Sequence, residues 1–293
     1  MTELVNRVNE RLPDLEVLSL EPLTGGACQD SFVAVVDVGT GPGRWVLRSD
    51  ASGHLPGSLQ RRDEYPVIER AHAAGVKTPA LHGLYEDLVR DGASAYFMDY
   101  VPGIAIGRKV VAGDELAAVR PNLLRALVAE LAIVHSITPN CGLALAEPER
   151  DSALEVGAVA ANLSLHHRAL DALDRPMLEL GLRWLEDNQP IERPLVLNHG
   201  DFRTGNFQVD PERGLTAVLD WEFAHWSSPA DDLGWLMVRD WRFGVVDKPA
   251  FGLGARAELL AAYEQRTGTA IDIAEVHFWE VMGNLRWAIG AIH

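Results

Sequence analysis

The stretch L-N-H-G-D-F-R-T-G-N, residues 197–206, and the segment V-L-D-W-E, residues 218–222, decide the fold of this chain. Together they supply Asp201, Asn206 and Asp220, in that order. Transfer of a phosphoryl group needs one carboxylate that orients the attacking hydroxyl. It also needs oxygen ligands for the magnesium ions that neutralise the phosphates. We expect Asp201 to take the first role, and Asn206 with Asp220 to bind the metal.

The flanking residues predict how these groups are held. Residues 194–197 form a short apolar run that is typical of a buried strand, and residues 207–209 and 215–219 form two strands joined by a turn. Antiparallel pairing would bring the open ends of those two strands together, and with them Asn206 and Asp220. The competing interpretation is an ordinary turn rich in Asp, Gly and Asn, which carries no chemistry. The apolar flanks and the order of the three polar groups favour a site.

These motifs resemble the signature of the aminoglycoside phosphotransferase and choline kinase-like superfamily, whose members are small-molecule relatives of the protein kinases. Further segments match the family in its own order along nearly the whole chain. They are Leu23–Gly26, Trp45–Arg48, Arg62–Tyr65, Phe97–Gly103, Val134–Ser136 and Ser228–Leu233.

The resemblance implies an α+β, protein kinase-like two-lobed fold, with an antiparallel sheet in the N-lobe and a mostly helical C-lobe. We assign residues 1–101 to a nucleotide-binding N-lobe. Residues 102–293 then form the helical C-lobe, with the catalytic loop and the acceptor site.

Composition limits the function without deciding it. The 293 residues are 47% hydrophobic, enough for one large core or two modest ones. No apolar run approaches the ~20 residues needed to cross a bilayer, and no signal peptide opens the chain, so we expect no membrane association and a cytoplasmic location. The net charge of −16 argues against a nucleic-acid partner. It permits a cationic substrate, although many enzymes are this acidic merely for solubility.

Hydrophobic patterning places the remaining parts. It predicts strands over residues 15–21, 31–38, 45–48 and 93–100, a helix over 58–75, and mainly helices after residue 114. His135 continues an apolar helical stripe, which favours a hydrogen-bonded core histidine. The tryptophans of the C-terminal third, including Trp241 and Trp287, are interpreted as core residues on helices.

The resemblance supplies candidate nucleotide ligands in the N-lobe. Gly25 and Gly26 would let backbone N–H groups approach phosphate oxygens. Arg48 occupies the place where protein kinases carry a lysine, and Glu64 would hold it through an ion pair. Arginine is a departure from that pattern, because it offers a planar fork of donors. Pro66 raises a second question: a helix that begins at Pro66 would leave Glu64 outside it.

Other roles also follow from the resemblance. The adenine is expected near backbone groups of Asp99, Tyr100 and Val101. Arg203 stands where protein kinases place a catalytic-loop lysine, and we expect it to offset charge on the transferred group. A surface arginine on a turn is the alternative. His199 is expected to brace the loop.

The sequence as a whole predicts an ATP- and Mg²⁺-dependent phosphotransferase that acts on a hydroxyl of a small-molecule acceptor. Aminoglycosides, choline-like alcohols, sugars and hydroxyacyl thioesters all remain open as acceptors, and the oligomeric state is not predicted. A catalytically silent nucleotide-binding protein is the alternative. Arg48 favours it slightly, and the intact Asp201, Asn206 and Asp220 count against it.

Overall fold

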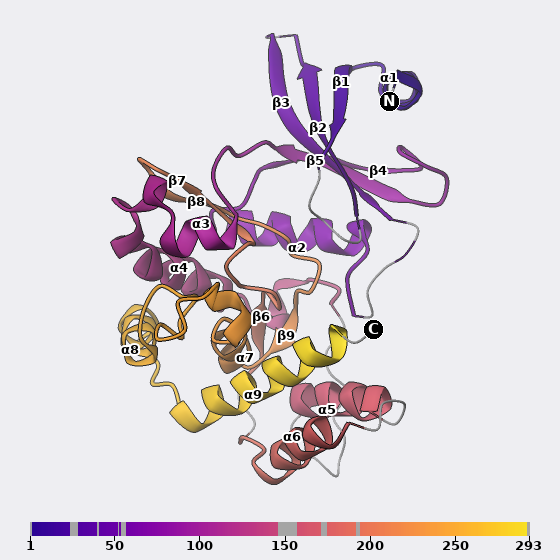
Figure 1. Cartoon of the computed structure of the whole chain (residues 1–293). Helices are drawn as coiled ribbons and strands as arrows, with labels where there is room; N and C mark the ends of the chain where they lie inside the picture. Colours follow the sequence, from indigo (N-terminus) through magenta and orange to yellow (C-terminus); the bar gives the residue numbers. More distant parts are fainter. Residues whose placement is uncertain are drawn as a thin grey trace. The chain divides into compact units, whose positions relative to one another are not determined.

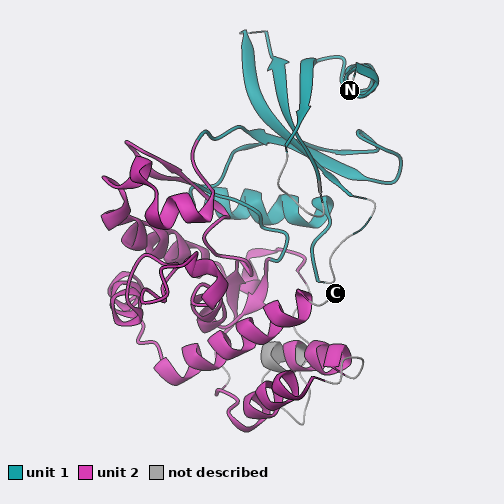
Figure 2. Ribbon diagram, in the orientation of Figure 1, with its two compact units in different colours: residues 1–102, 217–223 teal, residues 103–216, 224–293 magenta. Residues whose placement is uncertain are grey.

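A computed structural model describes residues 2–23, 29–39, 41–51, 53, 57–145, 157–170, 175–191 and 194–291. The chain forms two compact units (Figure 2). Unit 1 contains Met1–Pro102 together with Ala217–Phe223, and unit 2 contains Gly103–Thr216 and Ala224–His293. The functional division predicted at residue 101 stays a prediction. The segment around Asp220, which we assigned to the C-lobe, packs with unit 1.

Unit 1 is built on a five-stranded antiparallel sheet with the strand order β1-β2-β3-β5-β4 (Figure 1). Its strands are β1 (Glu16–Pro22), β2 (Gln29–Asp37), β3 (Pro42–Asp50), β4 (Leu81–Glu86) and β5 (Ser94–Asp99). Two helices accompany the sheet, α1 (Thr2–Arg11) and α2 (Arg61–Ala73). Four of the strands agree with the sequence prediction, and β4 was missed.

The two faces of the sheet differ in chemistry. Successive residues of a strand point to opposite faces. Leu47 and Phe97 therefore pack with Val8 of α1 in an apolar cluster. Their chain neighbours Arg48 and Tyr96 are paired across β3 and β5 and point to the opposite face, where Tyr96 meets α2. One face of the sheet is a hydrophobic core, and the other carries buried polar groups.

Helix α2 answers the question that Pro66 raised. The helix begins at Arg61 and continues through Pro66, so the alternative start at Pro66 is wrong. Glu64 lies in the first turn and is completely buried. The proline removes one backbone hydrogen bond without ending the helix, which packs against β3, β4 and β5.

Unit 2 is mostly helical. Its helices are α3 (Gly107–Ala112), η1 (Asp114–Leu116), α4 (Arg120–Val134), η2 (Pro139–Cys141), α5 (Gly157–Leu170), α6 (Pro176–Asp187), α7 (Pro229–Trp235), η3 (Arg239–Arg242), α8 (Arg256–Thr267) and α9 (Ile273–Gly290). Helix α9 packs against α5, α6 and α7, and α4 packs against α8 (Figure 1). Strands β6 (Val196–Asn198) and β9 (His225–Ser227) pair with each other, as do β7 (Phe207–Asp210) and β8 (Gly214–Val218).

The antiparallel sheet and the helical second unit confirm the α+β class, and the hairpin after Asn206 is confirmed as well. The helix expected to run as far as Trp241 is interrupted. Helix α7 ends at Trp235, Val238 is extended, and Trp241 lies in the short turn η3. Within the described ranges, no helix has the length and apolar content that crossing a bilayer requires.

Candidate active site

The loop that carries Asp201 is held by a buried carboxylate on α7. Asp232 is 1% exposed and accepts hydrogen bonds from the backbone N–H groups of His199 (2.7 Å) and Gly200 (3.0 Å). His135 adds a contact at 3.3 Å and also bonds to Tyr263 at 2.7 Å, which confirms it as a core histidine. Burial acts to raise the pKa of Asp232, but the contact with His135 and the backbone donors outweigh it and lower that pKa. The loop is anchored by an ionised carboxylate.

Glycine allows the loop its shape. Gly200 has φ 77° and Gly205 has φ 119°, values that other residues rarely adopt. These two positions flank the segment from Asp201 to Thr204, so the left-handed backbone conformation occurs on both sides of that segment.

The Asp201 carboxylate is held by side-chain donors of three kinds. Its Oδ1 accepts from the indole Nε1 of Trp235 (2.8 Å) and from Nε of Arg203 (2.9 Å). Its Oδ2 accepts from Nδ2 of Asn206 (2.6 Å). These contacts fix the direction in which the carboxylate faces, and such a fixed group is suited to orient a hydroxyl.

Asn206 has its amide orientation fixed by these contacts. Its Nδ2 also donates to the backbone carbonyl of Asp201 at 3.0 Å. Because the nitrogen serves Asp201, the Oδ1 oxygen is turned to the other side and can act as a ligand to a cation. The side chain is 7% exposed, so this orientation is set by packing.

Arg203 is fixed between a carboxylate and an aromatic ring. Its guanidinium lies 4.4 Å from the ring centroid of Trp241 while its Nε pairs with Asp201. Trp241 in turn packs against Trp235 at 5.4 Å and Trp287 at 4.7 Å between centroids. Arg203 is thus held by contacts with Asp201 and Trp241, and its role beside the transferred group stays a prediction.

In unit 1, Arg48 lies between two carboxylates. Its Nη2 donates to Asp220 Oδ1 at 2.7 Å, and its Nη1 lies 3.6 Å from Glu64 Oε1. Burial acts to lower the pKa of Arg48, but Glu64 and Asp220 outweigh it and hold the pKa well above the ordinary value. The pairing of Arg48 with Glu64 that the sequence suggested is present in the structure. Asp220 has φ 69°, which is uncommon for a residue other than glycine.

A second buried arginine completes this network. Arg61, 2% exposed, pairs with Glu64, and its Nη2 lies 3.3 Å from Glu222 Oε2. The backbone N–H of Leu59 donates to the carbonyl of Glu222 at 2.6 Å. Glu222 thus fastens the segment that carries Asp220 to the start of α2. Sequence reasoning missed Arg61, since nothing in its spacing marked it.

The structure describes only some of the remaining residues that are candidates for binding the nucleotide. Gly25 and Gly26 lie outside the described residues. Asp99 donates its backbone N–H to Ala80, and Tyr100 donates its N–H to Arg44. Among the described residues, Val101 is the one of the three whose N–H is not taken by such a bond.

The structure therefore brings the candidates together in two groups. Unit 2 assembles Asp201, Arg203 and Asn206, and unit 1 assembles Arg48, Glu64 and Asp220. Sequence reasoning also missed Trp235, whose indole N–H bonds directly to Asp201. A buried indole N–H usually finds a partner, but the sequence does not say which one.

The chemistry of Asn206 and Asp220 fits magnesium. Both side chains offer hard oxygen ligands, and Mg²⁺ in nucleotide sites is commonly bound by one or two protein groups together with phosphate oxygens. In the described part of the chain, no group of three or more His, Cys, Asp or Glu side chains is arranged to hold a metal by itself.

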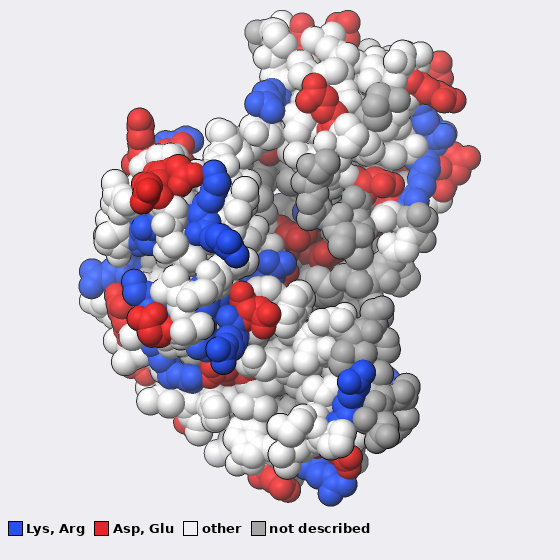
Figure 3. Space-filling view, viewed as in Figure 1, with Lys and Arg blue, Asp and Glu red and all other residues white. Residues whose placement is uncertain are grey.

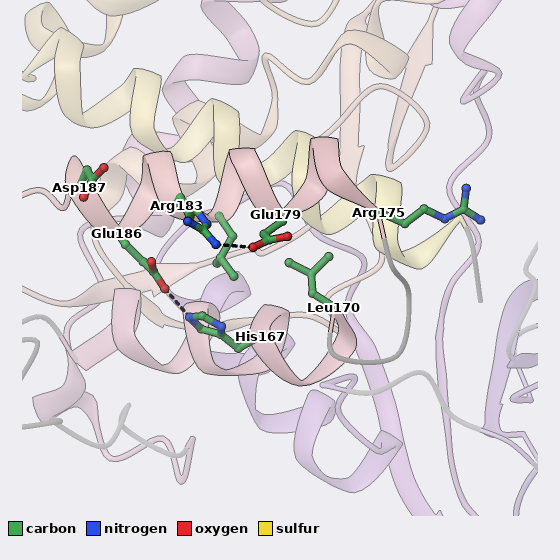
Figure 4. A pocket seen from close by; sticks show the side chains of 8 residues that line it. His167, Leu170, Arg175, Glu179, Arg183, Glu186 and Asp187 are labelled. Carbon is green, nitrogen blue, oxygen red and sulfur yellow. Dashed lines mark hydrogen bonds and ion pairs between the residues drawn. The ribbon is translucent and has the colours of Figure 1, made fainter.

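A cavity of about 590 Å³ lies between α5 and α6 (Figure 4). Four of its charged groups form two pairs, His167 with Glu186 and Arg183 with Glu179, both at 2.5 Å. On the face shown in Figure 3, the described acidic and basic side chains are interspersed, without an extended patch of one sign.

Comparison with known proteins identifies relatives over most of the chain. The family model for the phosphotransferase enzyme family matches residues 20–279. Acyl-CoA dehydrogenase family member 10 of Mus musculus is 29% identical over 196 residues, which are 65% of this chain and 18% of that protein. Ethanolamine kinase 2 of Mus musculus is 24% identical over 225 residues, 72% of this chain and 55% of the relative. The chain thus spans at most about half the length of these relatives.

Solved structures share the fold. A Ralstonia eutropha JMP134 protein provisionally assigned to the aminoglycoside phosphotransferases superposes with a TM-score of 0.70 and 21% identity, over 96% of this chain and 86% of that one. The gentamicin complex of APH(2″)-IIa gives 0.65 and 16%, over 100% and 89% of the two chains. Macrolide 2′-phosphotransferase MphH of Brachybacterium faecium gives 0.62 and 20%, over 99% and 94%. These likenesses confirm the predicted protein kinase-like fold, and the family model confirms the predicted superfamily.

Proposed function

Because the chain belongs to the phosphotransferase enzyme family, we propose that it transfers the γ-phosphate of ATP to a hydroxyl of a small molecule in a magnesium-dependent reaction. The observation that carries this proposal is the Asp201 carboxylate, aligned by Trp235, Arg203 and Asn206 on a loop anchored to Asp232. ATP as the phosphate donor makes the cytoplasm the expected location.

Asp201 would orient the acceptor hydroxyl and receive its proton as the bond to phosphorus forms. The transition state of phosphoryl transfer is loose, so positioning and charge stabilisation supply most of the catalysis. The three donors on Asp201 fix the orientation of its carboxylate. Arg203, held on Trp241, would place its charge beside the transferred group.

The metal and the nucleotide would be held by the remaining candidates. We assign Mg²⁺ to Asn206 and Asp220, and the ion would neutralise phosphate charge when bound. The phosphates are assigned to Gly25, Gly26 and Arg48, with Glu64 positioning Arg48. The adenine is assigned to the segment Asp99, Tyr100 and Val101.

A catalytically silent nucleotide-binding protein is the second candidate. One observation favours it: the carboxylate of Asp220 is bonded to Arg48 at 2.7 Å, so a metal has to compete with an ion pair for that oxygen. The aligned Asp201 counts against it, because a silent protein has no need of an oriented hydroxyl acceptor site.

Calorimetry tests the nucleotide and metal assignments together. ATP should bind clearly in the presence of magnesium and much more weakly in chelator, because Asn206 and Asp220 hold the ion well only against phosphate oxygens. Release of ADP that depends on an added small-molecule alcohol then separates the enzyme from the silent protein. Equal ATP affinity with and without magnesium would defeat the metal assignment.

A further inference from the structure

Arg286 of α9 lies beside the catalytic loop. Its Nη2 donates to the backbone carbonyl of Gly200 at 2.9 Å, and its guanidinium carbon lies 3.9 Å from the ring centroid of Trp235. The same indole donates its N–H to Asp201. Arg286 therefore packs against the same indole ring that bonds to the carboxylate that would orient the acceptor.

Arg286 has no acidic partner in the described part of unit 2. No carboxylate there forms an ion pair with it, and its side chain is only half-buried. The acidic side chains around the loop have other partners: Asp232 bonds to the loop backbone, Glu280 pairs with Arg242 and Arg256, and Asp201 pairs with Arg203. An oxyanion that binds Arg286 therefore does not have to displace an ion pair.

The aromatic groups around Arg286 add a second donor. Trp241 is 4% exposed, and its indole N–H has no acceptor among the described residues. Trp287, which packs edge-on against Trp241, is 39% exposed. A buried donor without a partner costs free energy unless a ligand or water supplies one. The polar groups of this cluster that can still bond to a ligand are hydrogen-bond donors, and apolar aromatic side chains lie beside them.

We infer that the acceptor carries an anionic group, a carboxylate or a phosphate, which Arg286 binds while Asp201 orients the hydroxyl. This inference rests on the proposed function and names the acceptor class for the same site. A guanidinium forms short, directional bonds to both kinds of oxyanion. A polycation would instead bring like charge against Arg286, so the acidity of the whole chain is a poor guide to its substrate.

A matched panel of alcohols tests the inference on wild-type protein with ATP and magnesium. For several chain lengths, the panel contains a hydroxy acid, its primary amide, the corresponding amino alcohol, and the phosphate monoester of the corresponding diol. An oxyanion should improve kcat/KM over the amide by about tenfold to a hundredfold, the range for a hydrogen bond between charged groups. Comparing the hydroxy acids with the phosphate monoesters identifies which oxyanion is used.

Variants then assign the preference to Arg286. Arg286→Gln should reduce the ratio of oxyanion to amide to about one, and Arg286→Glu should shift the preference towards the amino alcohol. Arg125→Gln removes an exposed arginine of α4 in the same unit and should leave the ratio unchanged. A merely structural contact to Gly200 would lower the rates for all four classes equally. Thermal unfolding checks that each variant is folded.

The outcomes separate the two proposals. Equal rates for the four classes, a preference for amino alcohols, or an unchanged ratio in folded Arg286→Gln would overturn the anionic acceptor while leaving the phosphotransferase intact. If no panel member reacts, calorimetry with magnesium and ADP decides, since failure of every hydroxy acid and phosphate monoester to bind more tightly than its amide also overturns it. Loss of ATP binding by wild-type protein would instead contradict the proposed function itself.

Discussion

The polar cluster of unit 1 and that of unit 2 use opposite means to hold a carboxylate. In unit 1, Glu64 is completely buried between Arg48 and Arg61. In unit 2, Asp201 is held by an indole, an amide and one guanidinium. In the first cluster the buried carboxylate is paired with two arginines. In the second, two of the three donors to the carboxylate are neutral, and the guanidinium groups lie against aromatic rings.

The difference has a physical consequence for each cluster. Removing one partner of a buried ion pair leaves an uncompensated charge, and that is strongly destabilising. Removing one neutral donor from Asp201 leaves its other two donors in place, so we expect it to change the orientation of the carboxylate more than the stability of the fold. We expect mutations in unit 1 to unfold the protein and mutations around Asp201 to lower its turnover.

The largest expected effect is on turnover. Asp201→Asn keeps the shape of the side chain but cannot accept the proton of a hydroxyl, so kcat should fall by about 10²- to 10⁴-fold. ATP affinity should stay close to that of the wild type, since the residue acts on the acceptor. Steady-state kinetics and calorimetry check both. Wild-type turnover in Asp201→Asn would remove the residue from its assigned role.

The next effect tests unit 1. Glu64→Ala leaves Arg48 and Arg61 without their shared buried partner and should reduce the free energy of unfolding by about 3–5 kcal/mol. Asp63→Ala, at an exposed neighbouring position of α2, is the control and should change it by less than about 0.5 kcal/mol. Urea unfolding measures both. A loss equal to the control would mean that the network does not stabilise unit 1.

A third prediction concerns His166 of α5, which lies in unit 2 and is 2% exposed. Burial lowers its pKa to about 4, and the positive charges of Arg286 and His167 act in the same direction. A histidine of the unfolded chain titrates near 6.5. Between these values the unfolded chain binds a proton that the folded chain does not. The stabilising effect of His166 is therefore complete above about pH 6.5 and is lost as the pH falls to about 4.

Measured by urea unfolding, this loss should amount to about 3 kcal/mol across that range in wild-type protein. His166→Gln should flatten the pH dependence, and His277→Gln, at an exposed position of α9, should leave it in place. If the free energy of unfolding had the same slope against pH in all three proteins, His166 would not be the residue responsible for the loss of stability.

The smallest expected effect separates the indole N–H from the ring. Trp235→Phe keeps the surface on which Arg286 lies but removes the donor to Asp201, and should lower kcat by about tenfold or more. Trp279→Phe is the matched control, because its buried N–H has no acceptor among the described residues. Equal kcat values for the two variants would show that the indole N–H does not align Asp201.

The sequence predicted those site residues that lie in recognisable motifs within short segments of the chain. Asp201, Asn206 and Asp220 were recognisable because a loop and a hairpin hold them within a short stretch, and Arg48 because residues 45–48 resemble the third strand of the family. Trp235 and Arg286 were not recognisable. Their contacts with the loop arise from the packing of α7 against α9, and helical periodicity does not show which residue of a buried face meets a given loop.

The same distinction explains the smaller errors. The pairing of Glu64 with Arg48 could be suggested but not settled, because a proline in the sequence does not say whether packing will keep a helix continuous. The break after Trp235 was missed because Met237 and Trp241 continue an apolar pattern, while extended Val238 ends the helix between them.

Residues 217–223 pack with unit 1, although the chain on both sides of them belongs to unit 2. On the ribosome, residues 1–102 emerge long before this segment does. Until residue 223 has been synthesised, Arg48 lacks Asp220 and Arg61 lacks Glu222. The buried ion-pair network of unit 1 is thus completed by a segment made much later in translation, and a gene fragment that stops at residue 102 should give a poorly folded product.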